Sequence, residues 1–128
     1  MPTVSGAFEV SLSPQQDALE AGRYLIEKSY HGELCGLATG QMLSCRFADG
    51  SAGYVALETF NGRLEGRSGG FTLLHRGMMS TADSQLSVEI VPGSGSGELQ
   101  GIEGQLVITN ESGKHSYQLN YQLTDLQS

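Results

Sequence analysis

Basic residues are scarce in this sequence. Seven Lys and Arg residues stand against 14 Asp and Glu residues, which gives a formal net charge of −7 at pH 7. Nucleic acids and anionic membrane surfaces are both bound by clustered Lys and Arg side chains. We therefore expect neither a nucleic acid nor a membrane as a partner of this chain.

Long apolar runs are also missing. No segment approaches the ~20 apolar residues that a membrane-spanning helix requires. Residues 1–4 lack the basic start and the apolar stretch of a secretory signal peptide. Apolar residues nevertheless make up 38% of the 128-residue chain, which is too much for a disordered acidic tail. We expect one soluble domain over residues 1–128, located in the cytoplasm.

Cysteine and histidine occur in no redox or metal-binding pattern. Cys35 and Cys45 form no CxxC pair. If both lie on one extended strand they are roughly 33 Å apart, which is too far for a disulfide. His31, His75 and His115 lack the short spacings of zinc sites. We expect free thiols, no metal and no cofactor.

Glycine, in contrast, is abundant. The 18 glycines are about twice the average share, and they stand between segments in which apolar and polar residues alternate. This pattern is typical of strands joined by tight turns. It predicts eight strands, at residues 3–12, 23–31, 33–47, 53–60, 71–79, 84–91, 105–109 and 115–124.

Two connections carry specific signals. Asn61-Gly62 is the strongest hairpin signal and predicts a turn after the strand of residues 53–60. Ser13 as an N-cap and Pro14 at the first helical position predict a short helix, or else a structured loop, over residues 13–22. Strands in hairpin succession with at most one short helix indicate an antiparallel up-and-down barrel or a sandwich.

The strand phases place charged residues on faces that are otherwise apolar. Glu58 shares a strand face with Tyr54 and Phe60, and His75 shares one with Phe71 and Leu73. If these faces point inward, a carboxylate and an imidazole meet inside the fold, where burial and pairing tune a general acid/base pair. A bulge would turn both to solvent, and an inward pair can also be purely structural.

Three blocks resemble a known family: residues 62–77 (GRLEGRSGGFTLLHRG), 91–104 (VPGSGSGELQGIEG) and 115–121 (HSYQLNY), with residues 5–10 and 30–34 also similar. They resemble a bacterial family of uncharacterised proteins whose fold is similar to the allene oxide cyclase barrel. The resemblance implies an eight-stranded antiparallel β-barrel that assembles as a homo-oligomer, a dimer or higher. Residues 13–22 depart from the family pattern. The family has no established activity.

Three functions remain open for such a barrel. The first is binding of a small apolar or amphipathic molecule in the lumen. Its lining would be aromatic and apolar, formed by Tyr54, Phe60, Phe71, Leu73, Tyr117 and Tyr121. The second is a cyclase or isomerase with Glu58 or His75 as the base and Tyr54 or Tyr117 as a hydrogen-bond donor. The third is a non-catalytic structural oligomer with a filled lumen.

Overall fold

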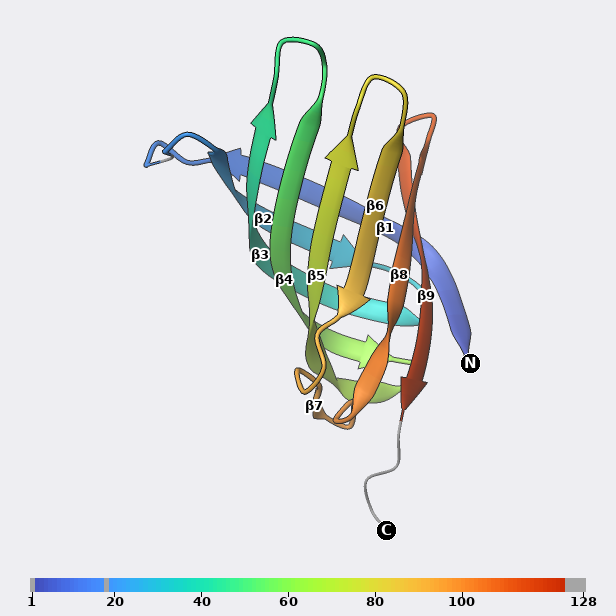
Figure 1. The fold of residues 1–128 in the computed structure, drawn as a ribbon. Helices are drawn as coiled ribbons and strands as arrows, with labels where there is room; N and C mark the ends of the chain where they lie inside the picture. The colour runs from blue at the N-terminus through green and yellow to red at the C-terminus, as the bar shows by residue number, and fades with distance from the viewer. Residues whose placement is uncertain (1, 18, 124–128) are drawn as a thin grey trace.

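The computed structural model describes residues 2–17 and 19–123, which form nine strands. These are β1 (Thr3–Pro14), β2 (Gly22–Tyr30), β3 (Leu34–Arg46), β4 (Ala52–Leu64), β5 (Arg67–Met79), β6 (Ser84–Ile90), β7 (Ser96–Gly97), β8 (Ile102–Glu111) and β9 (Lys114–Leu123). Eight of them pair antiparallel in the order β4-β3-β2-β1-β9-β8-β6-β5, and β5 returns to β4 (Figure 1). The predicted eight-stranded antiparallel barrel is confirmed.

The sequence left open which face of each strand points inward, and the structure places the faces that carry Glu58 and His75 inside the barrel. In β4, Tyr54, Ala56, Glu58 and Phe60 lie on the inner face, and the residues between them are exposed. In β5, the inner face carries Phe71, Leu73 and His75. No bulge reverses either strand, because the β4–β5 register runs unbroken from Ala52↔Met79 to Leu64↔Arg67.

The turn predicted at Asn61-Gly62 is wrong. β4 continues through this pair to Leu64, and the chain turns at Glu65 and Gly66, whose φ angles are 48° and 83°. Gly62 instead allows two strands to lie close together, because a Cβ there would lie 2.2 Å from the Cys35 carbonyl oxygen of β3. The glycine is thus needed for a close approach of neighbouring backbones and not for a turn.

Of the two alternatives for residues 13–22, the helix is wrong, and the loop is correct for the described residues between Pro14 and Gly22. Ser13 and Pro14 are the last residues of β1 and pair with Leu25 and Tyr24 of β2. The residues that follow form turns and bends, apart from Ala18, which lies outside the described residues. Pro14 is tolerated there because it ends its strand, where its missing N–H removes no interior ladder bond.

Among the described residues there is no helix that could span a membrane.

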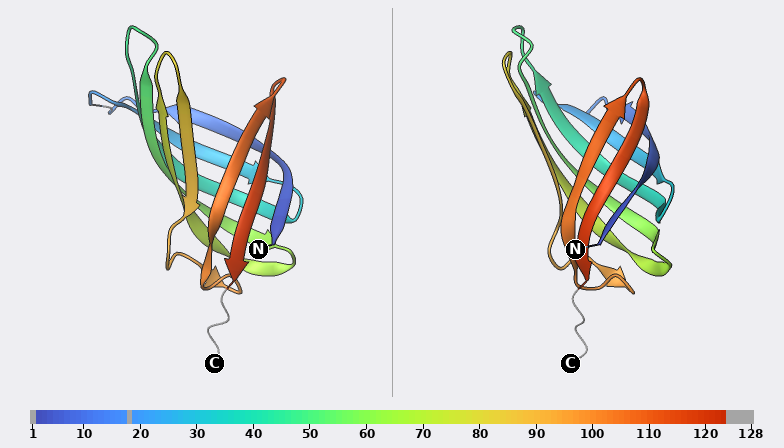
Figure 2. Two further views of the ribbon diagram at one scale, coloured as in Figure 1. Left: turned by 45° about the vertical axis from the view of Figure 1, so that its right-hand side comes forward. Right: turned by 90° about the vertical axis from the view of Figure 1, so that its right-hand side faces the viewer.

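The barrel differs between its two ends (Figure 2). At the lower end, the inward-facing side chains of Tyr30, Phe60 and Phe71 are almost completely buried, and Leu99 of the loop after β7 is fully buried beside them. We call this region the packed half. At the upper end, inward-facing side chains are half-buried or exposed; these are Leu12, Met42, Tyr54, Met79 and Leu86. We call this region the open end.

Candidate functional site

A buried polar cluster lies between the packed half and the open end. It consists of Lys28 and Tyr30 of β2, Glu58 of β4 and His75 of β5. Glu58 is fully buried, and Oε1 accepts a hydrogen bond from Lys28 Nζ at 2.8 Å and contacts His75 Nε2 at 2.5 Å. Its Oε2 accepts a hydrogen bond from the Tyr30 hydroxyl at 2.8 Å. A carboxylate inside an apolar barrel is thereby fully paired.

Small residues of β3 make this cluster possible. β3 lies between β2 and β4, and its inward positions at this level are Ala38 and Gly40. A Cβ at Gly40 would lie only 2.7 Å from the Glu58 Cα. Because these two positions carry almost no side chain, Lys28 can reach across β3 to Glu58.

The cluster stabilises the charged form of Glu58. Burial alone raises the pKa of a carboxyl group, but the hydrogen bond from His75 and the ammonium of Lys28 outweigh this effect and lower the Glu58 pKa below its ordinary value of 4.5. Burial and then the Glu58 charge raise the pKa of Tyr30 and of Tyr54. Both hydroxyls therefore stay protonated at neutral pH. Lys28 Nζ also lies 4.9 Å from the centre of the Phe8 ring, a cation–π contact.

Lys28 and His75 give the cluster its contact with the outside. Lys28 is 7% exposed and His75 is 4% exposed, whereas Glu58 is 0% exposed. Within the described residues, the His75 ring is held through Nε2 alone. No fully buried side-chain nitrogen or oxygen there lacks a hydrogen-bond partner. We infer that His75 Nδ1 is not fully buried.

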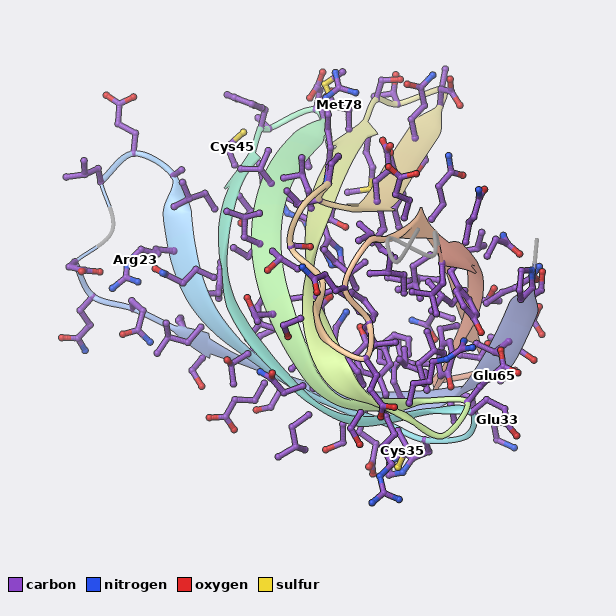
Figure 3. The ribbon with its side chains drawn as sticks, turned by 90° about the horizontal axis from the view of Figure 1, so that it is seen from below. Arg23, Glu33, Cys35, Cys45, Glu65 and Met78 are labelled. Carbon is purple, nitrogen blue, oxygen red and sulfur yellow. The ribbon has the colours of Figure 1, made fainter. Side chains whose placement is uncertain are left out.

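The residues predicted to line a ligand site are divided between two places. Tyr54 is half-buried at the open end. On the inner face of β4, Ala56 lies between Tyr54 and Glu58. Phe60, Phe71 and Leu73 belong to the packed half, where the Phe60 and Phe71 ring centres are 5.2 Å apart. Figure 3 shows this interior from below, with Cys35 and Cys45 pointing away from it; both thiols are free and exposed.

Tyr117 and Tyr121 do not meet the cluster through their hydroxyls. The Tyr117 hydroxyl donates to the His31 carbonyl oxygen at 2.8 Å and accepts from the Leu34 N–H at 3.2 Å, so it holds the β2–β3 connection. The Tyr121 hydroxyl bonds to Glu65, and burial together with this contact raises the pKa of Tyr121 to about 12. The tyrosine that does lie on Glu58 is Tyr30.

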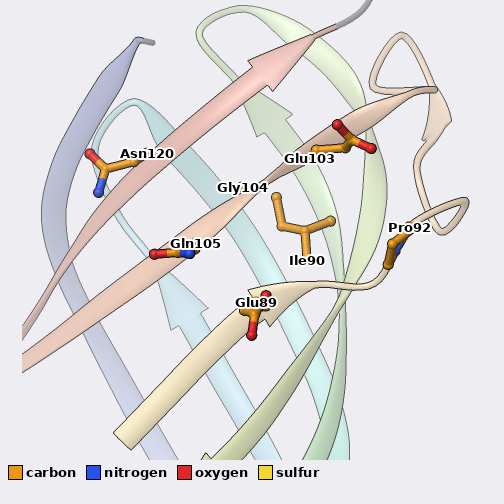
Figure 4. A pocket seen from close by; sticks show the side chains of 7 residues that line it. All are labelled: Glu89, Ile90, Pro92, Glu103, Gly104, Gln105 and Asn120. Atoms are coloured by element: carbon orange, nitrogen blue, oxygen red, sulfur yellow. The ribbon is translucent and has the colours of Figure 1, made fainter.

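A second feature lies on the outer wall, where β6 meets β8. The two strands share a single registered pair, Glu89↔Gln105. Beside it is an open pocket of about 460 Å³ lined by Glu89, Ile90, Pro92, Glu103, Gly104, Gln105 and Asn120 (Figure 4). Its charged side chains are two carboxylates. Among the described residues no group of three His, Cys, Asp or Glu side chains is arranged to hold a metal ion.

Comparison with known proteins identifies the family but no activity. A family model described as "Protein of unknown function (DUF3224)" matches residues 3–121. The chain belongs to the DUF3224 family. A crystal structure of a DUF3224 protein of unknown function from Shewanella oneidensis MR-1, at 1.84 Å resolution, is 39% identical in sequence to this chain. The match covers 98% of each chain with a TM-score of 0.93. No curated protein matches the sequence.

The DUF3224 assignment confirms the uncharacterised family expected from the sequence blocks. It also confirms the barrel, because a solved family member superimposes on nearly the whole chain. The likeness to allene oxide cyclases stays a prediction. What this DUF3224 protein does must therefore be argued from its own side chains.

Proposed function

We propose that this DUF3224 protein binds one small amphipathic molecule at the open end of its barrel. The observation that carries the proposal is the Lys28–Glu58–His75 cluster, which lies below the open end and in which Lys28 and His75 keep a small exposed fraction while Glu58 has none. Buried ion pairs are weak contributors to stability. Ionisable groups whose pKa values are shifted by burial and by a charged partner are, however, common in binding and catalytic sites.

The open end supplies the apolar part of such a site. Its side chains are Leu12, Met42, Tyr54, Met79 and Leu86, all of which point into the barrel without being covered by it. Methionine side chains adapt to ligands of different shape. The packed half, with Phe60 and Phe71, forms the rigid base below the ligand.

The cluster also indicates which polar group the ligand carries. Lys28 Nζ has hydrogen-bond donors only, and its bonds to Glu58 and Tyr30 leave one of three protons free. A ligand group that accepts hydrogen bonds, such as a carbonyl or carboxylate oxygen, therefore suits Lys28 Nζ. A ligand group that only donates would face the ammonium without a partner.

Proton transfer on the bound molecule is the second candidate. It is favoured by the 2.5 Å distance between His75 Nε2 and Glu58 Oε1, because a carboxylate that accepts the Nε2 proton leaves the lone pair on Nδ1 and fixes the orientation of the ring. His75 would then remove a proton from the carbon beside a ligand carbonyl, which leaves an enolate, and a proton would return to the same carbon. In D2O, the wild-type protein would introduce deuterium beside the carbonyl of 2-dodecanone, and His75→Gln would not.

A tryptophan reporter tests the binding proposal. The chain contains no tryptophan, so Leu86→Trp places the sole indole at the open end. Val107→Trp is the matched control, since Val107 is similarly exposed but lies on the outer face of β8. On titration with dodecanoate, we expect a saturable change of emission in Leu86→Trp and none in Val107→Trp.

The polar anchor is tested in the same reporter protein. Adding Lys28→Met should weaken dodecanoate binding about tenfold or more, because one charge-assisted hydrogen bond contributes about 1.5–3 kcal/mol. If dodecanoate and dodecanol both leave the Leu86→Trp emission unchanged, the barrel is a filled structural unit and the proposal is wrong. Equal affinity for dodecanoate with and without Lys28 would show that the cluster is not part of the binding site.

A further inference from the structure

The barrel wall has one place at which two neighbouring strands hardly pair. Among the described residues, β6 and β8 share the single registered pair Glu89↔Gln105, whereas every other two neighbouring barrel strands share at least five. Both views of Figure 2 show β6 and β8 diverging toward the upper end of the barrel. Residues 84–87 of β6 and 107–111 of β8 therefore have a partner strand on one side only. We call the region between these two edges the open seam.

Two hydrogen bonds show which backbone groups of β6 face the open seam. The Val91 N–H donates to the Thr72 carbonyl oxygen at 2.9 Å, and the Ser80 N–H donates to the Asp83 carbonyl oxygen at 2.8 Å. In an antiparallel sheet, alternate residues of a strand turn both of their backbone groups toward the same neighbour. Odd-numbered residues of β6 therefore bond to β5. The N–H and C=O of Leu86 point the other way, into the open seam.

The edges of the open seam lack the usual protection. An unpaired strand edge is a template for another chain, and proteins commonly block it with lysine or proline. β6 and β8, which are both completely described, contain no lysine, arginine or proline. The Ser84 N–H is taken by the Asp83 carboxylate at 2.8 Å, so the first free donor on this edge is that of Leu86. The edge of β6 is thus accessible to an added strand.

The inner face beside the open seam is apolar. Leu86 and Val88 of β6 point into the barrel, and so do Leu106 and Ile108 of β8. Successive side chains of a strand point to opposite faces of its sheet. A strand placed in the open seam would therefore turn every second side chain toward apolar surroundings.

The outer face beside the open seam is acidic. Glu89 and Glu103 line the pocket of about 460 Å³ at the lower end of the seam (Figure 4). Neither carboxylate forms an ion pair within the described part of the chain. The cations on the adjacent strands are Arg76 of β5 and Lys114 of β9, and Lys114 lies opposite Glu111. Basic side chains on the outer face of an added strand would complement Glu89 and Glu103.

We propose that the open seam binds an extended segment of another protein, in which apolar residues alternate with lysine or arginine. The segment pairs with the edge of β6 and adds a strand to the barrel wall. Its backbone bonds to Leu86, its apolar side chains face the open end, and its basic side chains face Glu89 and Glu103. The net charge of −7 attracts such a segment as well. This inference does not rest on the small-molecule site, and its experiments use the protein without dodecanoate.

Amide hydrogen exchange of the wild-type protein, followed by NMR, tests the pairing. The probe is an acetylated and amidated eight-residue peptide in which lysine and valine alternate. At about 1 mM it leaves roughly a tenth of the protein free if its Kd is about 100 µM, so the Leu86 N–H should exchange about tenfold more slowly. The Gln85 and Ser87 amides are the internal controls. They should change less, because these residues turn their backbone groups toward β5.

Two control peptides separate backbone pairing from charge. The first has N-methyl groups on its four central residues, which keeps every side chain but removes the hydrogen-bond donors. The second has glutamate in place of lysine. We expect neither peptide to protect the Leu86 amide. Equal protection by either control, or an unprotected Leu86 amide with the lysine–valine peptide, would overturn the proposal.

A pair of variants tests the same edge by affinity. Leu86→Pro removes the N–H that faces the open seam, and Leu86→Ala is the matched control that loses the same side chain but keeps this N–H. Because the Leu86 N–H does not face β5, Leu86→Pro should keep the barrel, which far-UV circular dichroism checks. Fluorescence anisotropy of the labelled peptide should show Leu86→Pro binding about fivefold more weakly than Leu86→Ala. Equal affinities would overturn the proposal, and if Leu86→Pro does not fold, the wild-type exchange decides.

Discussion

Glu58 is the residue whose environment is most unusual. It is fully buried, yet burial does not neutralise it, because His75 and Lys28 hold its pKa below 4.5. The carboxylate also accepts the Tyr30 hydroxyl, so both oxygens are used. Removing one member of such a buried pair leaves the other charge without a partner, which typically costs about 3–5 kcal/mol.

The acid sensitivity of the fold follows from this pKa. Because the folded protein binds the Glu58 proton more weakly than the unfolded chain, the stabilisation is fully present above pH 4.5 and is lost as the pH falls through the lower folded value. Urea unfolding should show that Glu58→Gln is about 3–5 kcal/mol less stable than wild type at pH 7. The difference in unfolding free energy between wild type and Glu58→Gln should narrow below pH 4.5.

A double variant controls for the unpaired lysine. Glu58→Gln with Lys28→Met removes both charges and should recover part of the stability lost in Glu58→Gln. A gap between wild type and Glu58→Gln that stays constant from pH 7 to pH 3 would contradict the account of Glu58 as an ionised, paired carboxylate.

Only Glu58 and His75 of the four cluster residues were predicted from the sequence. Strand alternation placed Glu58 and His75 on the same strand faces as aromatic residues, and the structure turns these faces inward and brings the two residues into contact. Lys28 and Tyr30 were missed, although they share the inward face of β2 with the buried Ile26. Alternation could have shown that Lys28 points inward. It could not show that Lys28 reaches Glu58, because this depends on the small side chains of the strand between them.

Among the elements, β4 shows that a glycine can be required for close packing as well as for a turn. Asn61-Gly62 lies inside the strand, and Gly62 faces Gly36 of β3 and Gly69 of β5. The actual turn uses Gly66, where a Cβ would meet no other atom within 4 Å. The two glycines therefore differ in what a side chain would meet.

This difference predicts that a side chain destabilises the protein at position 62 and is tolerated at position 66. Gly62→Ala places a Cβ 2.2 Å from the Cys35 carbonyl oxygen, so the strands must separate, at a cost of about 1–3 kcal/mol or more. Gly66→Asn should cost less than about 1 kcal/mol, because Asn tolerates a positive φ at an open turn. Thermal unfolding of both variants measures the difference. Equal losses would show that Gly62 is not a packing position.

Local sequence signals predicted which strands form better than they predicted where each strand ends. All eight barrel strands were anticipated, because alternation follows directly from one buried face. The helix at Ser13 and Pro14 and the turn at Asn61-Gly62 were wrong, because both signals are local and both segments are held by pairing with distant strands. The closure of the barrel by the pairing of β1 with β9 was implied by the family resemblance and not by any single segment.

As a whole, the molecule is a barrel that is filled at one end and accessible at the other. The packed half contains Phe60, Phe71 and Leu73, and the open end presents Met42 and Leu86. The charged cluster lies at the boundary. This arrangement supports a ligand site without a fully hollow lumen.

Native mass spectrometry tests the central claim most directly. The protein is purified gently from the cells that make it, and the spectrum is recorded before and after addition of dodecanoate. The account predicts one discrete small-molecule adduct per chain, lost or weakened in Lys28→Met and retained in Val107→Lys. A chain that is bare as purified, and stays bare with dodecanoate, would contradict the claim and would leave Lys28, Glu58 and His75 as structural residues alone.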